Sequence, residues 1–232
     1  MKTLELVIAR YQEDLQWVRR VPKRFRVTVY NKQAESPVLP PRRHVELIPL
    51  SAVGREEQAY LQHIVRRYDD LADITVFAQG KPFDHVPSFH KVLHHIAFQQ
   101  VAVNGFLWFG FIIDEDDVTG SLLFQNWNRN PDRDPLPLEA FWQALWNEPA
   151  PERVTFYPSA HFAVTADQIR SRPKGFYERA VRISAELPHA GHCFERVWDR
   201  LFNANGIPPE YRVAPKPVYL RRIRRATPWV KR

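Results

Sequence analysis

The stretch from Thr75 to His85 constrains the fold more than any other part of the sequence. It begins as a run of apolar and β-branched residues and ends in glycine, proline and the polar pair Asp84 and His85. This pattern is typical of a buried strand that runs into a loop at its carboxyl end. In open α/β sheets, ligands bind just outside the carboxyl ends of strands. The pair is therefore a candidate functional site; the alternative is that it only caps the helix that follows.

Short apolar runs and helical patterns alternate along the first third of the chain. The predicted strands cover residues 4–9, 26–30, 45–50 and 74–78, and the predicted helices cover residues 15–21 and 54–70. A strand, a polar turn and a helix in this order open a βαβ unit. We therefore expect a single α/β domain of the Rossmann-like type, with a mainly parallel central sheet flanked by helices.

Acidic residues and histidines in the middle of the chain are candidate metal ligands. An apolar strand is predicted over residues 106–113 and runs into four acidic residues at 114–117. Carboxylates after a buried strand can hold a divalent cation, although acid-rich surface turns are also common. His90 and His94 lie four residues apart in a helix predicted over residues 89–103, but no third ligand is spaced to join them.

The net charge of +7 is unevenly distributed over the 232 residues. Eight Lys and Arg residues and no acidic residue follow Glu210, and the rest of the chain has 25 basic and 26 acidic residues. We therefore expect a domain over residues 1–210 and a basic tail over residues 211–232. Such a tail can bind nucleic acid, anionic lipid or an acidic partner. The alternative is a solubilising end that packs through its apolar residues.

Composition also narrows the expected location of the protein. A single cysteine, Cys193, excludes an internal disulfide and fits a reducing compartment. No apolar run approaches the ~20 residues of a membrane span, and the amino terminus shows no signal-peptide pattern. We expect a cytoplasmic protein without a transmembrane segment.

Segments spread over most of the chain carry a resemblance to a known family. They are residues 7–17, 29–32, 53–56, 60–64, 76–80, 83–85, 160–164, 169–173, 176–177 and 195–198. In these segments the chain resembles the domain-of-unknown-function family 3431, which is similar to compact GT-A glycosyltransferases. The resemblance implies a GT-A-like domain that uses a nucleotide-sugar donor.

The resemblance also implies where the donor binds. In GT-A enzymes the turn after the first strand holds the base and ribose of the nucleotide, and here that turn contains Arg10, Tyr11 and Asp14. Gln79, at the end of the fourth strand, and Arg55, which can clamp phosphate, complete the expected donor site.

A divalent cation, Mn²⁺ or Mg²⁺, is the cofactor that the resemblance implies. GT-A enzymes hold it on a carboxylate pair near the fourth strand, where it stabilises the charge of the departing diphosphate. This chain departs from that pattern, because no Asp-x-Asp follows the strand. Three possibilities remain open: Asp84 and His85 bind the metal, Asp114 and Asp116 bind it, or Arg55 and other cations replace it.

The catalytic base that the resemblance implies is Glu195. An inverting transfer needs a carboxylate that accepts the proton of the acceptor hydroxyl, and Glu195 is expected near the start of a late helix. The alternative is a helix carboxylate paired with Arg196 or Arg170. His161, Arg170 and Arg172 are expected on the acceptor side, although His161 could instead satisfy a hydrogen bond in the core.

These observations favour a glycosyltransferase whose acceptor is a hydroxyl of an unidentified molecule. The basic tail suggests a polyanionic acceptor, such as modified DNA or an anionic surface glycan. The second hypothesis is a non-catalytic nucleic-acid-binding protein that uses the tail; against it, the excess of basic residues is confined to the tail and the body has no recognised reader motif. A third is a metal-dependent hydrolase built on the histidines or on residues 114–117.

Overall fold

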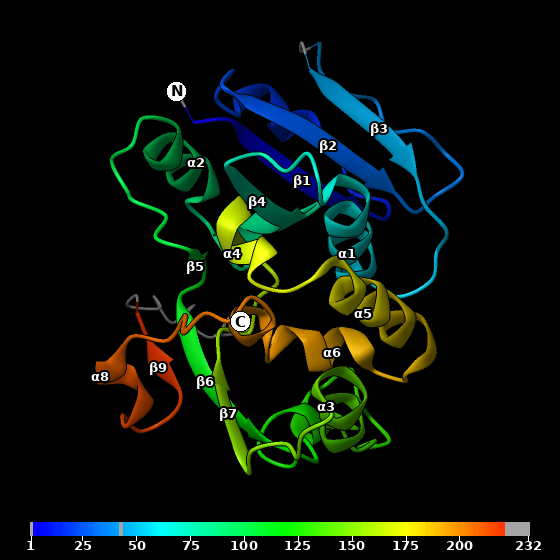
Figure 1. The fold of residues 1–232 in the computed structure, drawn as a ribbon, viewed down its shortest axis with the longest axis vertical. Coiled ribbons are helices and arrows are strands. Elements are labelled where there is room, and N and C mark those ends of the chain that lie inside the picture. Colours follow the sequence, from blue (N-terminus) through cyan, green and yellow to red (C-terminus); the bar gives the residue numbers. More distant parts are fainter. Residues whose placement is uncertain (1, 42–43, 221–232) are drawn as a thin grey trace, which may run out of the picture.

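In a computed structural model of the chain, which describes residues 2–41 and 44–220, a six-stranded sheet forms the centre (Figure 1). Its strand order is β3-β2-β1-β4-β8-β5. The strands are β1 (Leu4–Arg10), β2 (Phe25–Asn31), β3 (Val45–Pro49), β4 (Ile74–Gln79), β5 (Phe106–Trp108) and β8 (Phe162–Thr165). β1 to β4 are parallel to one another, and β8 is antiparallel to both β4 and β5. The prediction of a mainly parallel central sheet flanked by helices is confirmed.

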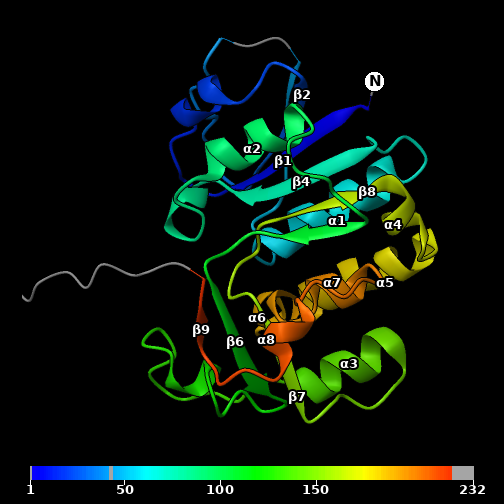
Figure 2. The same cartoon turned by 90° about the vertical axis from the view of Figure 1, so that its left-hand side faces the viewer.

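Alternate residues of the central strands bury their side chains in two different cores. In β1, Val7 and Ala9 belong to one core, while Leu6 and Ile8 belong to the other, as expected because successive side chains of a strand point to opposite faces. The first core includes α1 (Glu56–Arg67) and α5 (Lys174–Glu186), and the second includes the 3₁₀ helix η1 (Gln16–Arg20) and α2 (Phe89–Ala97). α1 and α2 therefore cover opposite faces of the sheet (Figure 2).

A second, three-stranded sheet lies beside the first core. It has the order β7-β6-β9 and consists of β6 (Ile112–Asp117), β7 (Arg153–Phe156) and β9 (Val218–Tyr219). β9 lies within the predicted tail and pairs with β6, whereas residues 221–232, which carry six of the tail's eight cations, lie outside the described residues.

The strand predicted over residues 106–113 is two strands in different sheets. Gly110 lies at the break between β5 and β6, and a Cβ there would come within 2.8 Å of the Tyr157 ring. The acidic residues 114–117 are also placed differently from the prediction. They belong to β6 and pair with β7, so they do not form a turn after the strand.

The remaining helices pack around the second sheet and the first core. They are α3 (Leu138–Trp146), α4 (Ala166–Arg170), α6 (Ala190–Glu195), α7 (Trp198–Leu201) and α8 (Pro209–Arg212), with the 3₁₀ turns η2 (Pro82–Asp84) and η3 (Phe124–Asn126). Thr165 caps α4, because its Oγ1 accepts a hydrogen bond from the Gln168 amide at 3.3 Å. No helix among the described residues is long and apolar enough to span a membrane.

Two predicted helices are shorter than the sequence suggested. The late helix that was expected to start near Glu195 is divided into α6 and α7, so Glu195 is the last residue of α6 and does not lie near a helix start. The helix expected over residues 89–103 ends at Ala97, and Gln99 beyond it adopts a left-handed conformation with φ of 58°.

An aromatic cluster centred on Phe162 joins the central sheet to the C-terminal helices. The Phe162 ring is fully buried and its centroid lies 5.2 Å from that of Phe77 in β4 and 4.9 Å from that of Trp198 in α7. The rings of Phe106 and Phe202 also contact it, at 5.3 and 5.6 Å. Aromatic contacts of this kind add to the free energy of burial.

We expect Phe162→Ala to lower the free energy of unfolding by about 3–5 kcal/mol, because it removes a buried ring and leaves a cavity between the sheet and α7. Urea denaturation followed by tryptophan fluorescence measures this change. The matched control is Phe98→Ala, since the Phe98 ring is 58% exposed; an equal loss in both variants would contradict the role assigned to Phe162.

Candidate functional site

A cleft of about 1190 Å³ opens where the carboxyl ends of β1, β2 and β4 face the second sheet. One wall, called here the sheet wall, includes Arg10, Tyr11, Lys32, Arg55, Gln79 and Lys81. The other, called here the β6–α6 wall, includes Asp114, Phe124, Asn126, Trp127, His192 and Glu195. The position agrees with the rule that ligands of α/β sheets bind at the carboxyl edge of the parallel strands.

The cleft brings together most of the residues that the sequence singled out. They are Arg10, Tyr11, Arg55, Gln79, Asp84, His85 and Glu195, together with the alternative metal ligand Asp114. These residues come from the ends of two parallel strands, from the loops around them and from the end of α6. Their convergence on one cavity makes it the candidate active site, while the roles of the individual residues stay predictions.

The buried Arg10 side chain forms hydrogen bonds to the loops of the sheet wall. It is 8% exposed, and its Nη1 donates to Asn31 Oδ1 at 2.6 Å and to the Glu35 carbonyl at 3.2 Å. Its Nε donates to the Glu13 carbonyl at 3.0 Å. Arg10 therefore fixes the turns after β1 and β2, and Tyr11 beside it presents a 51% exposed ring to the cleft.

Lys32 is a site residue that the sequence analysis missed. Its ammonium donates to the backbone carbonyls of Val53, Gly54 and Arg55 at 2.7, 2.9 and 2.5 Å. Burial lowers its pKa, although the nearby Glu57 and Glu56 carboxylates oppose that effect. A lysine directly after a strand was visible in the sequence, but nothing there showed that it closes the loop carrying Arg55.

Arg55 reaches from this loop to the β6–α6 wall. Its Nη1 lies 2.8 Å from His192 Nε2, and its side chain remains 48% exposed. The Glu56 carboxylate raises the pKa of Arg55 against the opposing effect of burial, and Glu195 and Glu57 add to the rise. Arg55 is therefore a fixed positive charge between the two walls of the cleft.

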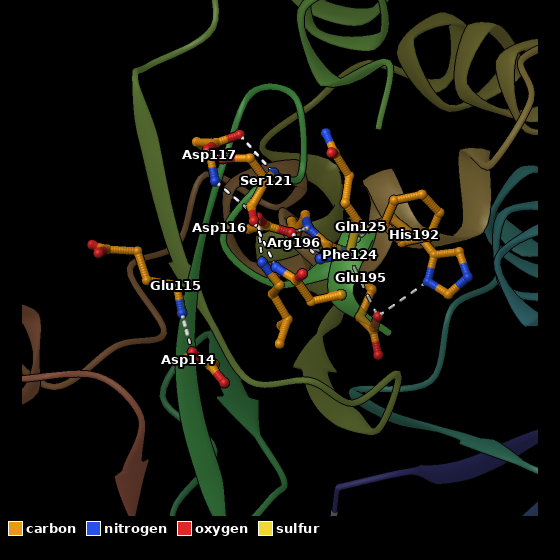
Figure 3. Close-up of polar contacts among 12 residues, drawn as sticks. Asp114, Glu115, Asp116, Asp117, Ser121, Phe124, Gln125, His192, Glu195 and Arg196 are labelled. Atoms are coloured by element: carbon orange, nitrogen blue, oxygen red, sulfur yellow. Dashed lines mark hydrogen bonds and ion pairs between the residues drawn. The ribbon is translucent and has the colours of Figure 1, made fainter. Parts of the chain in front are cut away.

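A buried ion pair between Asp116 and Arg196 holds the β6–α6 wall together (Figure 3). Arg196 Nη2 and Nε donate to Asp116 Oδ2 at 2.6 and 3.1 Å. The backbone amides of Leu123 and Phe124 donate to the same carboxylate, each at 3.1 Å. Because Asp116 is fully buried and bonded in this way, it is not available as the metal ligand considered from the sequence.

Glu195 lies next to this ion pair and lines the cleft (Figure 3). Its Oε2 is 3.7 Å from His192 Nδ1 and 3.8 Å from Arg196 Nη1. Burial by itself would raise the pKa of Glu195, but the nearby His192 side chain and the charges of Arg196 and Arg55 lower it below its ordinary value. Glu195 is therefore an ionised carboxylate at neutral pH.

Aromatic rings and amides make up the rest of the β6–α6 wall. The centroid of the His192 ring lies 4.8 Å from that of Phe124 and 4.9 Å from that of Trp127. Trp127 is 36% exposed and lies between the exposed side chains of Asn126 and Asn128. An exposed indole flanked by amides can stack on a sugar or base and hydrogen-bond its polar groups.

The residues predicted to bind a metal lie in the cleft but are not gathered into a cage. Asp84 Oδ2 is 3.1 Å from Lys81 Nζ, and both side chains are exposed. Burial raises the pKa of Asp114 and so disfavours the ionised carboxylate that would bind a cation. Among the described residues, no three His, Cys, Asp or Glu side chains are grouped to hold a metal ion. A Mg²⁺ ion at Asp84 would therefore depend on phosphate and water oxygens for most of its ligands, as in many phosphate sites.

Four predicted site residues lie away from the cleft. Asp14 Oδ1 accepts a hydrogen bond from the Gln16 backbone amide at 2.9 Å and so orders the start of η1. Arg170 is exposed on α4. The Arg172 guanidinium stacks over the Phe176 ring at 4.8 Å. His161 is fully buried behind the cleft and its Nδ1 lies 2.8 Å from Ser159 Oγ, which agrees with the alternative of a core hydrogen bond.

We expect His161 to make the protein less stable as the pH falls. Burial, aided by the charge of His85, lowers the pKa of His161 from 6.5 to about 3 in the folded state. Between these two values the unfolded chain binds a proton that the folded protein does not, so stability is lost as the pH falls below about 6.5. Between pH 7 and pH 5 the loss from this residue is about 2 kcal/mol.

Urea denaturation of His161→Gln at pH 7 and pH 5 measures that contribution. The difference in unfolding free energy between the two pH values should shrink by about 2 kcal/mol relative to the unmodified protein. His94→Gln, at an exposed position of α2, serves as the control and should leave the difference unchanged. An unaltered pH dependence in His161→Gln would contradict the assignment.

Comparisons with known proteins agree on the family and give little beyond it. The family model described as "Protein of unknown function (DUF3431)" matches residues 6–213. No curated protein matches the chain in sequence. Among solved structures, the chain is similar to 4-diphosphocytidyl-2C-methyl-D-erythritolsynthase from Anaerococcus prevotii DSM 20548, at a TM-score of 0.40 and 10% identity, over 89% of this chain and 85% of that one. At this level the likeness carries no argument about activity.

Proposed function

This chain belongs to the DUF3431 family, and we propose that it is a glycosyltransferase that moves a sugar from a nucleotide-sugar donor to a hydroxyl group of an acceptor. The observation that carries the proposal is the convergence in one cleft of the groups that such a transfer needs. A basic loop at the carboxyl edge of the parallel strands faces an ionised carboxylate on the last residue of α6.

The sheet wall supports donor binding. The exposed Tyr11 ring, held beside the buried Arg10, offers a surface for the base of the nucleotide. Arg55 and Lys81 present cationic groups that are 48% and 65% exposed, and a diphosphate can replace the carboxylates that now face them. The Lys81–Asp84 pair is exposed on both sides, and exposed ion pairs are weak, so the exchange at Lys81 has a low free-energy cost.

The β6–α6 wall supports the chemical step. As the acceptor oxygen attacks the anomeric carbon, the bond between that carbon and the diphosphate oxygen breaks, and the hydroxyl proton passes to Glu195. The leaving diphosphate gains negative charge, which Arg55 and Lys81 stabilise. His192 and Arg196 hold the Glu195 carboxylate in place. A divalent cation on Asp84 and His85 would add positive charge at the diphosphate.

We expect at least one nucleotide-sugar to raise the melting temperature of the protein, because a ligand that binds only the folded state stabilises it. A thermal-shift series with UDP-, GDP- and CDP-sugars, each with and without Mn²⁺ or Mg²⁺, tests this. Arg55→Gln should reduce the shift, whereas Arg182→Gln, at an exposed position of α5, should not. A complete absence of shifts would overturn the proposal.

Metal dependence of the shift can be assigned in the same assay. Asp84→Ala should remove the part of the shift that depends on Mn²⁺ or Mg²⁺ if the cation binds there, and Asp114→Ala should remove it if the alternative ligand is used. A shift that is the same in chelator indicates that Arg55 and Lys81 act without a metal.

Glu195→Gln separates binding from catalysis. We expect this variant to retain the donor-induced thermal shift but to lose roughly 10²–10⁴-fold in transfer rate, because the amide accepts no proton from the acceptor. The rate is measured as release of the nucleoside diphosphate in the presence of acceptor. Equal rates in Glu195→Gln and the unmodified protein would show that another group is the base.

A further inference from the structure

A second cavity lies on the face of the central sheet opposite α1, between η1 and α2. This groove has a volume of about 550 Å³ and is lined by Trp17, Arg19, Arg20, Phe83, His90 and Lys91, among others. None of its lining residues is acidic. It differs in this from the active-site cleft, where carboxylates accompany the cations.

The positive charge of the groove follows from two segments that lack acidic residues. Residues 15–34 and 85–113 contain no Asp or Glu, and the fold places η1 from the first segment beside α2 from the second (Figure 2). The excess of cations is therefore not confined to the C-terminal segment, contrary to the expectation from the sequence. Folding concentrates it on one face of the domain.

Hydrogen bonds and ring contacts join the two sides of the groove. The His90 Nε2–H donates to the Trp17 carbonyl at 3.1 Å, and Trp17 Nε1 donates to the Gly80 carbonyl at 2.8 Å. The Trp17 ring centroid lies 5.6 Å from that of Phe83 and 5.9 Å from that of His90. The Arg24 guanidinium also bonds to the Ala97 carbonyl at the end of α2.

The cations that line the groove have no partners within the described part of the chain. Arg19 and Arg20 are exposed at the end of η1, and Lys91 is exposed on α2. No hydrogen bond or ion pair joins any of the three to another described residue. Guanidinium and ammonium groups held in one groove without carboxylates form a site for an anion with several charges.

We propose that this groove binds an anionic glycan chain, whose acidic groups pair with Arg19, Arg20 and Lys91. A nucleic-acid strand is less suited to it, because base stacking needs open ring faces and the three aromatic rings of the groove are half-buried against one another. Guanidinium groups match carboxylate and phosphate geometry without any ring face.

Residues 81–88 lie between the groove and the cleft and contribute lining to both. Lys81, Asp84 and His85 line the cleft, whereas Phe83 and Pro87 line the groove. A chain bound in the groove can therefore continue past this segment to the cleft. This part of the inference rests on the proposed function: the anionic glycan is the acceptor, and the groove holds the portion of it that is remote from the transferred sugar.

Binding of a fluorescent oligogalacturonate at low salt tests the groove directly. The full chain should bind it, and the methyl-esterified oligomer, which has the same sugars without the charges, should not compete. We expect Arg20→Gln combined with Lys91→Gln to raise Kd by roughly tenfold. The control pair, Lys2→Gln with Arg182→Gln, removes the same charge at two exposed positions elsewhere and should leave Kd within about twofold.

The outcomes separate this inference from the proposed function. No binding of oligogalacturonate, or an equal loss in both double variants, would overturn the glycan site. Tighter groove-dependent binding of an oligothymidylate would overturn it in favour of nucleic acid. Donor-induced thermal shifts are measured on the same variants and should equal those of the unmodified protein. If oligogalacturonate binds but no nucleotide-sugar shifts the melting temperature, the transferase proposal is rejected and the glycan site in the groove is retained.

Discussion

The buried ion pair between Asp116 and Arg196 is the interaction on which the geometry of the cleft depends. Removing two charges from water is costly, and the cost is recovered only where the pair and its remaining hydrogen-bonding groups are satisfied. Here the Asp116 carboxylate also accepts hydrogen bonds from three backbone amides, and Arg196 Nη1 donates to the His192 carbonyl at 2.7 Å. The pair thereby fixes β6, the turn at η3 and the end of α6 to one another. Glu195 and the aromatic residues of the β6–α6 wall are held in place by it.

The sheet wall has its own internal support. Arg10 and Lys32 follow neighbouring parallel strands, and both direct their cationic groups mainly to backbone carbonyls of the loops. Each of these two cations thus fixes a separate loop through its hydrogen bonds to backbone carbonyls. Arg55 and Lys81 remain exposed for a ligand because these internal bonds are made by other residues. Each wall is therefore preorganised by a buried group that does not itself need to touch the substrate.

The sequence predicted the central sheet well because its signals are local. The apolar runs of β1, β2 and β4 are short, bounded by polar turns and buried on both faces, so the positions of these strands along the chain could be inferred. The same reasoning placed Arg10, Gln79 and Asp84 at the carboxyl edge of the sheet. It failed where tertiary contacts decide: the break at Gly110 and the division of the last helix at Glu195 each depend on residues distant in the chain. Lys32 and Asp116 were missed as organising residues for that reason, since Lys32 bonds to a carbonyl 21 residues away and Asp116 pairs with Arg196, 80 residues away.

Residues 81–88 form a wall of both cavities, and this has a thermodynamic consequence. Phe83 faces the groove while its neighbours Lys81 and Asp84 face the cleft, all within one turn of backbone at η2. An occupant of one cavity that displaces this turn changes the free energy of occupying the other. Such coupling is reciprocal, so the factor by which a groove ligand changes the affinity of a cleft ligand equals the factor by which the cleft ligand changes the affinity of the groove ligand. A three-residue turn is thus the element through which the two cavities would communicate.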